Sequence, residues 1–256
     1  MRILRIGVLL LVLIGVAAHT WLDRVTTTAW DRTLWVGIYP LNADGSAVAD
    51  QYIRGLRVED FASIESFFAR EAGRSGVPLA QPVHIELYPP SARLPPILAA
   101  GAGPIATAWW SLKLRWFALR ATDVPGRAPS PIRVFVLYHD PGVSERVPHS
   151  LGLQKGLIGV VHAFADKAMN GSNGIVIAHE TLHTLGATDK YDLATGAPRY
   201  PSGFADPDRT PLYPQDRAEI MAGQRALTAT EHEMPDSLRD EVVGPRTAAE
   251  IGWPRR

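Results

Sequence analysis

The residues best able to carry chemistry lie between positions 179 and 189, which read HETLHTLGATD. His179 and His183 are four residues apart, so on a helix their imidazoles lie one turn apart on the same face. Two imidazole nitrogens in that relation can both reach a zinc ion at about 2.0–2.1 Å. Glu180 lies to one side of that face, where its carboxylate can take a proton from a metal-activated water without binding the metal. The spacing predicts hydrolysis by a metal-activated water with Glu180 as general base.

A helix supplies two such ligands, and the third must come from chain that turns back after the helix. Gly186 permits the left-handed conformation that ends a helix, and Asp189 follows three residues later. A carboxylate binds zinc at about 2.0–2.2 Å and leaves a fourth position for water. We therefore expect Asp189 to be the third ligand. In the alternative arrangement a glutamate farther along the chain takes this role, and the available ones are Glu219, Glu231 and Glu233.

Histidines at this spacing also occur on amphipathic helices that bind no metal. Here the segment 175–185 is strongly apolar, and two histidines and a glutamate within it would destabilise the fold unless a metal satisfied them. The glycine at 186 and the aspartate at 189 add the turn and the acidic group that such a site needs. Metal ligation is therefore favoured over packing. His162 lacks this spacing and is interpreted as a packed strand residue that could also line the cleft.

The pattern HExxHxxGxxD resembles the zinc signature of the metzincin clan of metallopeptidases, in the variant with aspartate as third ligand. Members of the clan place a methionine in a tight turn beneath the metal, and by this resemblance Met221, within EIMAG at 219–223, forms the floor of the site. The resemblance covers the central and C-terminal third of the chain. It implies a metzincin-like zincin domain, a Zn2+ cofactor and a peptide or protein substrate.

The sequence also departs from that clan. Astacin-like and serralysin-like members carry a tyrosine two residues after the methionine, and this chain has Gly223 there. Tyr191, two residues beyond Asp189, is the alternative candidate for polarising a substrate carbonyl and so stabilising the transition state. Packing within the loop is the competing interpretation of Tyr191.

Apolar runs, apolar residues at helical spacing and turn residues predict the elements that position these groups. The predicted strands are 35–39 (ended by Pro40), 83–88, 132–138 and 157–164. The predicted helices are 58–70 (with Gly73 and Gly76 as stops), 105–120, 175–185 (capped by Ser172 or Asn173) and 246–251. Residues 149–156 and 186–218 are predicted loops. This order indicates an α+β (α/β-like) domain with a mixed twisted sheet, an active-site helix and a loop-rich C-terminal part.

Two of these elements carry further expectations. The strand 157–164 is expected at the upper rim of the cleft, where an extended peptide could add to the sheet edge. The helix 105–120 is apolar around most of its circumference, which indicates deep burial or contact with a partner. Its aromatic residues are interpreted as core or membrane-proximal packing, and they are Trp109, Trp110, Trp116 and Phe117.

The N-terminus resembles an export signal. Arg2 and Arg5 precede the apolar run 6–18, which ends in the small residues Ala17 and Ala18. We expect residues 1–20 to be a signal peptide or an N-terminal membrane anchor, and residues 30–256 to be one catalytic domain. The protein is then periplasmic, secreted or membrane-anchored facing outside the cytoplasm. A buried N-terminal element of the domain is the alternative.

Composition narrows the classes of function. The 256 residues include 26 Lys and Arg and 26 Asp and Glu, so no surplus of positive charge predicts a nucleic-acid partner. The chain contains no cysteine, which excludes a cysteine nucleophile, thiolate metal ligands and disulfides. It also contains no Gly-x-Ser-x-Gly elbow and no phosphate-binding loop.

The sequence thus predicts a zinc metallopeptidase, specifically a metalloendopeptidase. One alternative is a zinc amidase acting on cell-wall peptides, which a comparison of unfolded protein with peptidoglycan fragments as substrates would separate. The other is a non-catalytic envelope protein that keeps the zinc site for structure. In that case chelation would lower the melting temperature and there would be no activity to lose.

Overall fold

A five-stranded mixed sheet lies at the centre of the computed structural model, which describes residues 26–99, 101–154 and 156–254. Its strands lie in the order β2-β1-β3-β5-β4. Their bounds are β1 Leu34–Asn42, β2 Val83–Leu87, β3 Ile132–His139, β4 Leu151–Leu153 and β5 Ile158–Phe164. The first four strands in that order are parallel, and β4 pairs antiparallel with β5 at the edge. The predicted mixed sheet is confirmed, whereas the signal or anchor predicted at 1–20 lies outside the described residues.

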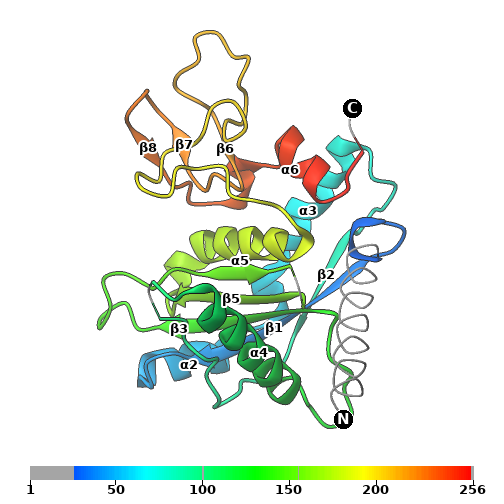
Figure 1. Cartoon of the computed structure of the whole chain (residues 1–256), viewed down its shortest axis with the longest axis vertical. Coiled ribbons are helices and arrows are strands. Elements are labelled where there is room, and N and C mark those ends of the chain that lie inside the picture. The colour runs from blue at the N-terminus through cyan, green and yellow to red at the C-terminus, as the bar shows by residue number, and fades with distance from the viewer. Residues whose placement is uncertain (1–25, 100, 155, 255–256) are drawn as a thin grey trace, which may run out of the picture.

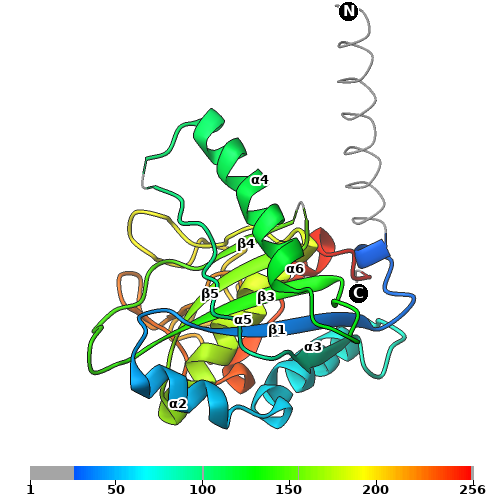
Figure 2. The ribbon, with the colours of Figure 1, turned by 90° about the horizontal axis from the view of Figure 1, so that it is seen from below.

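Helices cover both faces of this sheet (Figures 1 and 2). The side chains of β3 show the division, since Val134 and Val136 belong to one buried cluster and Phe135 and Leu137 to another. The first cluster packs against α2 (Ala47–Gly55), α3 (Ala62–Ser75) and α5 (Asn170–Leu185). The second packs against α4 (Pro104–Ala121). The helix with the HExxH pattern, α5, therefore lies on the opposite face from α4.

The chain after α5 forms a separate layer on the far side of that helix (Figure 1). Residues 187–217 contain only turns, bends and isolated bridges, as predicted. Short strands and one helix follow, with bounds β6 Ala218–Glu219, β7 Arg225–Ala226, β8 His232–Glu233, β9 Glu241–Val242 and α6 Pro245–Glu250. The site described below lies between this layer and α5.

Most predicted elements are confirmed, but β1 runs past Pro40 to Asn42. The carbonyl of Ile38 accepts a hydrogen bond from the backbone N–H of Tyr88, so alternate residues of β1, Pro40 included, direct their backbone groups toward β2. The strand β2 ends at Leu87, the partner of Ile38. A backbone N–H at position 40 would therefore have had no partner in a neighbouring strand, so β1 can contain a proline there.

The helix predicted at 58–70 begins as a 3-10 turn at Val58–Phe61 and continues as α3 to Ser75. Gly76 adopts the left-handed conformation and ends it, whereas Gly73 lies inside the helix. The helix α2 has no counterpart in the prediction. Within the described residues, no helix is both long and apolar enough to cross a membrane.

Three predictions near the site are wrong. The segment 149–156 is not wholly loop, because it contains β4, and β4 rather than the strand 157–164 forms the edge of the sheet. Helix α5 begins at Asn170, so neither Ser172 nor Asn173 caps it. The Asn173 side chain instead accepts from the N–H of Phe164 and donates to its carbonyl, which joins α5 to the end of β5.

Candidate metal centre

Helix α5 places both histidines toward the C-terminal layer. Its opposite side packs into the core through Ile175, Ala178 and Leu182. The helix ends at Gly186, whose φ of 105° is left-handed and unfavourable for any residue with a side chain. A side chain there would also clash, because an ideal Cβ would lie 2.4 Å from Nε2 of Gln154. The glycine at 186 therefore provides the helix-exit turn that the sequence predicted.

Backbone carbonyls fix the orientation of both imidazole rings. The Nδ1 atom of His179 donates to the carbonyl of Ile220 at 2.8 Å, and that of His183 donates to the carbonyl of Ala187 at 2.8 Å. In a neutral imidazole a protonated Nδ1 leaves a lone pair on Nε2. Such a second bond is the usual way in which metal-binding histidines are oriented. Both Nε2 atoms are therefore prepared to donate electron pairs to a cation.

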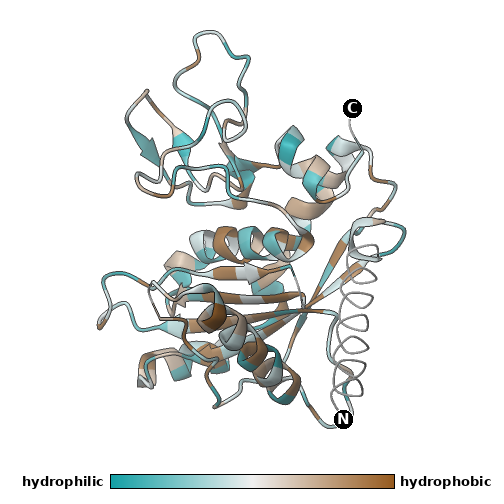
Figure 3. Ribbon diagram, in the orientation of Figure 1, coloured by the Kyte–Doolittle hydropathy of each residue, from teal (hydrophilic) through white to brown (hydrophobic). Residues whose placement is uncertain are grey.

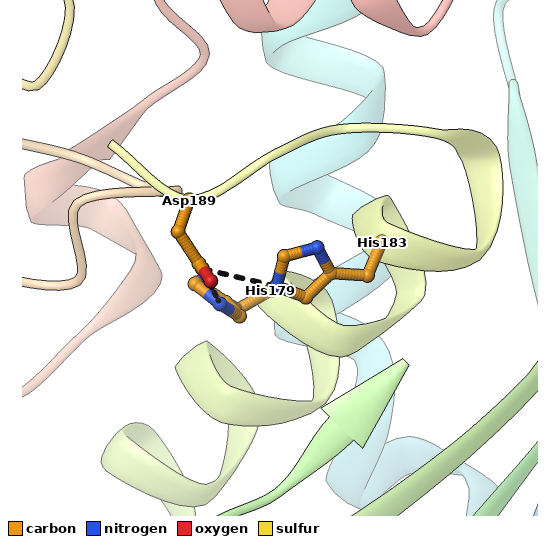
Figure 4. Close-up of side chains that lie close together, drawn as sticks. All are labelled: His179, His183 and Asp189. Atoms are coloured by element: carbon orange, nitrogen blue, oxygen red, sulfur yellow. Dashed lines mark ion pairs between the residues drawn. The ribbon is translucent and has the colours of Figure 1, made fainter. Parts of the chain in front are cut away.

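Asp189 completes the cluster. Its Oδ1 atom lies 3.3 Å from Nε2 of His179 and 3.1 Å from Nε2 of His183 (Figure 4). Two ligands at a zinc–ligand distance of about 2.0–2.1 Å and a tetrahedral angle are about 3.3 Å apart, so these separations fit one zinc ion. The Oδ1 atom is buried and has no well-oriented hydrogen bond within the described residues. Among those residues, only these three form a group of histidine and acidic side chains close enough to hold a metal ion.

Electrostatics within the cluster support the same arrangement. Burial by itself raises the pKa of Asp189, but the two adjacent imidazoles outweigh it and hold that pKa well below its usual range. The carboxylate is thus ionised at neutral pH. With Nε2 of each imidazole unprotonated, a cation at the point between the three groups would be attracted by this carboxylate and by both nitrogen lone pairs.

Neighbours on both sides of Asp189 hold the loop that carries it. The carboxylate of Glu250, on α6, accepts from the N–H and hydroxyl of Thr188 at 2.9 and 3.0 Å. The buried ammonium of Lys190 donates to the same carboxylate at 2.7 Å. The backbone N–H of Lys190 donates to the carbonyl of Met221 at 2.9 Å. These contacts, and not the glycine turn alone, return the aspartate to the histidines.

The predicted methionine turn, residues 219–223, lies directly against the cluster. The carbonyl of Glu219 accepts from the N–H of Ala222, and Gly223 has a left-handed φ of 67°, so the chain reverses here. Met221 is fully buried in the core cluster that includes α5. Through its neighbour Ile220 this turn accepts the hydrogen bond of His179. The turn therefore contacts the cluster through the carbonyl of Ile220.

Glu219 supports this turn from below and is not part of the cluster. Its Oε2 accepts from the N–H groups of Met221 and Ala222 at 2.8 and 3.1 Å. Its Oε1 accepts from the N–H of Gly244 at 3.1 Å and the hydroxyl of Thr247 at 2.6 Å. With both oxygens so occupied, Glu219 does not act as the alternative third ligand. The other two alternatives, Glu231 and Glu233, are exposed and lie outside the cluster.

Glu180 is buried beside the histidines, and its Oε2 has no hydrogen-bond partner within the described residues. Burial raises the pKa of its carboxyl, and the neighbouring His179 and His183 lower it only in part. A carboxylate that is desolvated and unpaired is a stronger base than one in water. The position suits proton transfer.

The edge strand β4 crosses α5 at this point. An ideal Cβ on Gly152 would lie 2.5 Å from both the carbonyl oxygen of Glu180 and the Cβ of His183. It would also lie 3.2 Å from Oε2 of Glu180. Only glycine allows the strand to lie this close to the helix, so the strand edge and the general-base candidate are brought together.

Tyr191 lies farther out. Its backbone forms an isolated bridge with Pro198, and its side chain is partly buried. Burial raises the pKa of its hydroxyl, and the charges of Asp189 and Glu180 raise it further. The hydroxyl is thus within electrostatic reach of the cluster. His162, by contrast, lies next to His139 on the α4 face of the sheet, with His139 Nε2 and His162 Nδ1 2.9 Å apart.

The sequence interpretation missed three contributors to this region. Gly152 gave no signal, because a lone glycine in a segment predicted as loop is ordinary. The Lys190–Glu250 pair joins residues 60 positions apart, which spacing arguments within one helix cannot detect. The sequence indicates Glu219 only as a possible ligand, whereas in the structure four N–H and hydroxyl donors converge on it.

Comparison of the sequence with protein-family models and with curated proteins finds no match.

Proposed function

We propose that this protein is a zinc-dependent metallopeptidase in which His179, His183 and Asp189 bind the metal and Glu180 is the general base. The observation that carries the proposal is the convergence of two oriented imidazoles and an ionised carboxylate on one point, next to a buried, unpaired glutamate. Zinc is favoured over other divalent ions because two nitrogens and one oxygen near tetrahedral separation are typical of catalytic zinc sites. Such an ion, when bound, supplies Lewis acidity for a water and for the substrate carbonyl.

The proton transfers belong to Glu180. Its carboxylate accepts one proton from the attacking water, whose oxygen forms a bond to the carbonyl carbon of the substrate amide. The same carboxyl then donates this proton to the amide nitrogen as the C–N bond breaks, which releases an amine and a carboxylic acid. Burial of Glu180 raises its proton affinity, so that it can accept the proton and return it.

The edge of β4 offers a place for the substrate. A strand at the edge of a sheet presents unpaired N–H and C=O groups, to which an extended peptide can add as a further strand. Because Gly152 of β4 lies against Glu180 and His183, a peptide paired with β4 would pass beside the metal cluster. This substrate strand replaces the predicted one at 157–164, which lies inside the sheet as β5.

Two variants of the purified protein test the assignment of roles. Glu180→Ala is expected to bind zinc with the stoichiometry of the wild type and to lose about 10²- to 10⁴-fold in hydrolysis of an unfolded protein substrate. His183→Ala is expected to lose both zinc and hydrolysis. Metal content is measured by atomic spectroscopy, and circular dichroism checks that each variant is folded.

Three results would contradict the proposal. Turnover by Glu180→Ala at the rate of the wild type would remove Glu180 from the mechanism. Cleavage of peptidoglycan fragments without cleavage of unfolded protein would indicate the amidase. If chelation lowered the melting temperature and the wild type hydrolysed neither substrate, the metal would serve structure only.

A further inference from the structure

Helix α4 has two apolar faces, and the sheet covers only one of them. Trp110, Leu114 and Ala118 are buried against the sheet. On the opposite side a second row of large apolar residues is between 57% and 88% exposed. This row, called here the outer stripe, consists of Ile105, Trp109, Leu112, Trp116 and Leu119. At about 100° per residue these five positions lie within about 40° of one line along the helix.

The outer stripe is far more apolar than an ordinary exposed helix face. Single exposed apolar residues are common, but a continuous row that includes two tryptophans marks a surface for contact. The helix is the outermost element on its side of the sheet, and Figure 3 shows hydrophobic turns along it. The stripe follows the full length of the helix, roughly 27 Å at about 1.5 Å per residue.

Positive charges border the outer stripe on both sides. At about 100° per residue, Lys113 and Arg120 flank it on one side and Arg115 on the other. Arg93, from the segment before the helix, lies near Lys113 and Arg120, since all three line one groove. The sequence from 87 to 122 contains no aspartate or glutamate. In a chain with equal numbers of acidic and basic residues, this is a local concentration of cations.

That groove lies beside the outer stripe and has a volume of about 690 Å³. Its lining combines the three cations with Trp109, Leu112 and Trp116. The guanidinium of Arg120 lies over the ring of Trp116, 4.6 Å from its centroid. A groove lined by both apolar and cationic side chains matches a lipid, whose acyl chain is apolar and whose headgroup phosphate is anionic.

We propose that the outer stripe of α4 docks on a membrane surface that contains anionic lipids. Tryptophans and long apolar side chains would enter the boundary between headgroups and acyl chains, while the flanking lysine and arginines contact phosphates. A second copy of this chain fits less well, because a symmetric contact would bring the same cations together with no acidic residue of the stripe between them. The chain's own apolar segment 6–18 fits less well too, since Arg2 and Arg5 beside it add further cations.

Docking in this way would fix how the domain faces the membrane. The helix α4 and the metal cluster lie on opposite sides of the sheet. With α4 on the lipid, the cluster and the loop-rich layer around it would face the aqueous phase (Figure 1). The inference concerns a different face from the proposed catalytic site, and it does not depend on the chain being a peptidase.

Because the chain contains no cysteine, a single introduced cysteine can report on this contact. Leu112→Cys labels the outer stripe, and Leu193→Cys labels another exposed leucine, in the loop-rich layer, as the control; the two are 57% and 77% exposed. Each full-length protein carries an environment-sensitive fluorophore and is reconstituted in vesicles of phosphatidylcholine, with or without phosphatidylglycerol. Doxyl-labelled lipid then serves as the membrane quencher and iodide as the aqueous quencher.

The label at 112 is expected to be quenched by doxyl lipid and protected from iodide only in vesicles that contain phosphatidylglycerol, whereas the label at 193 stays accessible to iodide. Replacing Arg93, Lys113 and Arg120 together by glutamine is expected to weaken docking about 100-fold, at about 1 kcal/mol for each basic side chain. The same full-length protein is measured in both lipid compositions, so any contribution of the N-terminal segment is present in both. A difference between the two lipids at position 112 and not at position 193 then reports on α4.

Four results would overturn the proposal. Equal exposure of the label at 112 in both lipids would show that α4 does not touch the membrane. Equal protection in both would remove the role of the anionic headgroup. Protection in dilute solution without vesicles or detergent would indicate that the chain covers its own stripe, and protection that rises with protein concentration would indicate a second copy.

Discussion

The Nδ1 atom of His179 lies 2.8 Å from the carbonyl oxygen of Ile220 and donates its proton there. This hydrogen bond joins α5 to the turn at 219–223, two segments that are 41 residues apart in the sequence. The buried carboxylate of Glu219 stabilises this turn by accepting hydrogen bonds from the N–H groups of Met221 and Ala222. The orientation of one candidate metal ligand thus depends on an acidic residue that does not reach the metal.

Glu219→Gln tests this dependence. An amide nitrogen cannot accept the hydrogen bonds that one carboxylate oxygen now accepts, so buried N–H groups lose partners at a cost of about 1–3 kcal/mol each. We expect the free energy of unfolding in urea to fall by roughly 3 kcal/mol in the presence of a chelator. Glu231→Gln, at an exposed position, should change it by less than about 0.5 kcal/mol. If Glu219 acted only as a metal ligand, its replacement would change the free energy of unfolding only with metal bound. Wild-type stability of Glu219→Gln in the chelator would therefore contradict its role in holding the turn.

Asp189→Asn and Asp192→Asn form a matched pair for the third ligand. Asp189 lies between the two imidazoles, whereas Asp192 is partly exposed, lies outside the cluster and accepts hydrogen bonds from the N–H groups of Ala194 and Thr195 in its own turn. We expect Asp189→Asn to weaken zinc binding by more than about 100-fold. Loss of a residue that only hydrogen-bonds to a ligand weakens metal binding less, by about 10- to 100-fold. Asp192→Asn should bind zinc as the wild type does. Competition with a chromophoric chelator measures both, and equal affinities would exclude Asp189 as a ligand.

Two cations contact the carboxylate of Glu250, and only one of them is buried. Lys190 is 2% exposed and donates at 2.7 Å, whereas the exposed Arg246 lies 3.4 Å away. Removing one partner of a buried pair costs about 3–5 kcal/mol, and an exposed pair contributes about 0–1 kcal/mol. Lys190→Met should therefore lower the free energy of unfolding by about 3 kcal/mol and weaken zinc binding by loosening the loop at Asp189. Arg246→Ala should change neither, and an equal effect of the two variants would contradict this account.

The contact between β4 and α5 predicts opposite effects at two glycines. A Cβ at Gly152 would lie 2.5 Å from the backbone of Glu180, whereas one at Gly73, inside α3, would meet nothing within 4 Å. Gly152→Ala should destabilise the protein by about 1–3 kcal/mol and reduce hydrolysis as β4 moves away from α5. Gly73→Ala should stabilise it by about 0.5–1 kcal/mol and leave hydrolysis unchanged. Thermal unfolding and turnover of the two variants, compared with the wild type, measure both effects.

Glu241 predicts a dependence of stability on pH. Both of its carboxylate oxygens are buried without a hydrogen-bond partner in the described part of the chain. Burial raises the pKa of this carboxyl from 4.5 to about 8, with a further contribution from the charge of Glu219. Between these two values the folded chain holds a proton that the unfolded chain has released, so this group's contribution to stability falls as pH rises from about 4.5 to about 8.

Glu241→Gln removes that titration. In chelator, the variant should gain stability relative to the wild type between pH 5 and pH 8 by more than about 1 kcal/mol, since each pKa unit corresponds to about 1.4 kcal/mol. Urea unfolding of both proteins at the two pH values measures the difference. Asp240→Asn, at an exposed neighbouring residue, is the control and should show no such trend. A constant difference between wild type and Glu241→Gln across this range would contradict the raised pKa.

The sequence alone determined the features that depend on local spacing. The i, i+4 relation of His179 and His183 fixes their common face on a helix wherever that helix lies. Gly186 ends the helix because its left-handed φ is accessible to glycine and unfavourable for other residues. Short apolar runs bounded by turn residues predicted four of the five sheet strands, because such runs and their boundaries are local properties of the sequence.

Tertiary structure decided which distant groups meet these residues. The strand β4 is only three residues long, and its pairing with β5, not its own pattern, makes it a strand. Whether Asp189 or one of the later glutamates joins the histidines depended on the contacts of Lys190 and Glu250, which no local spacing encodes. The outer stripe of α4 is apolar in sequence, but only the position of the sheet shows which of its two apolar faces is buried. Local periodicity cannot decide between such alternatives, because each possible third ligand and each apolar face of α4 is compatible with the same helix. Long-range packing decides between them.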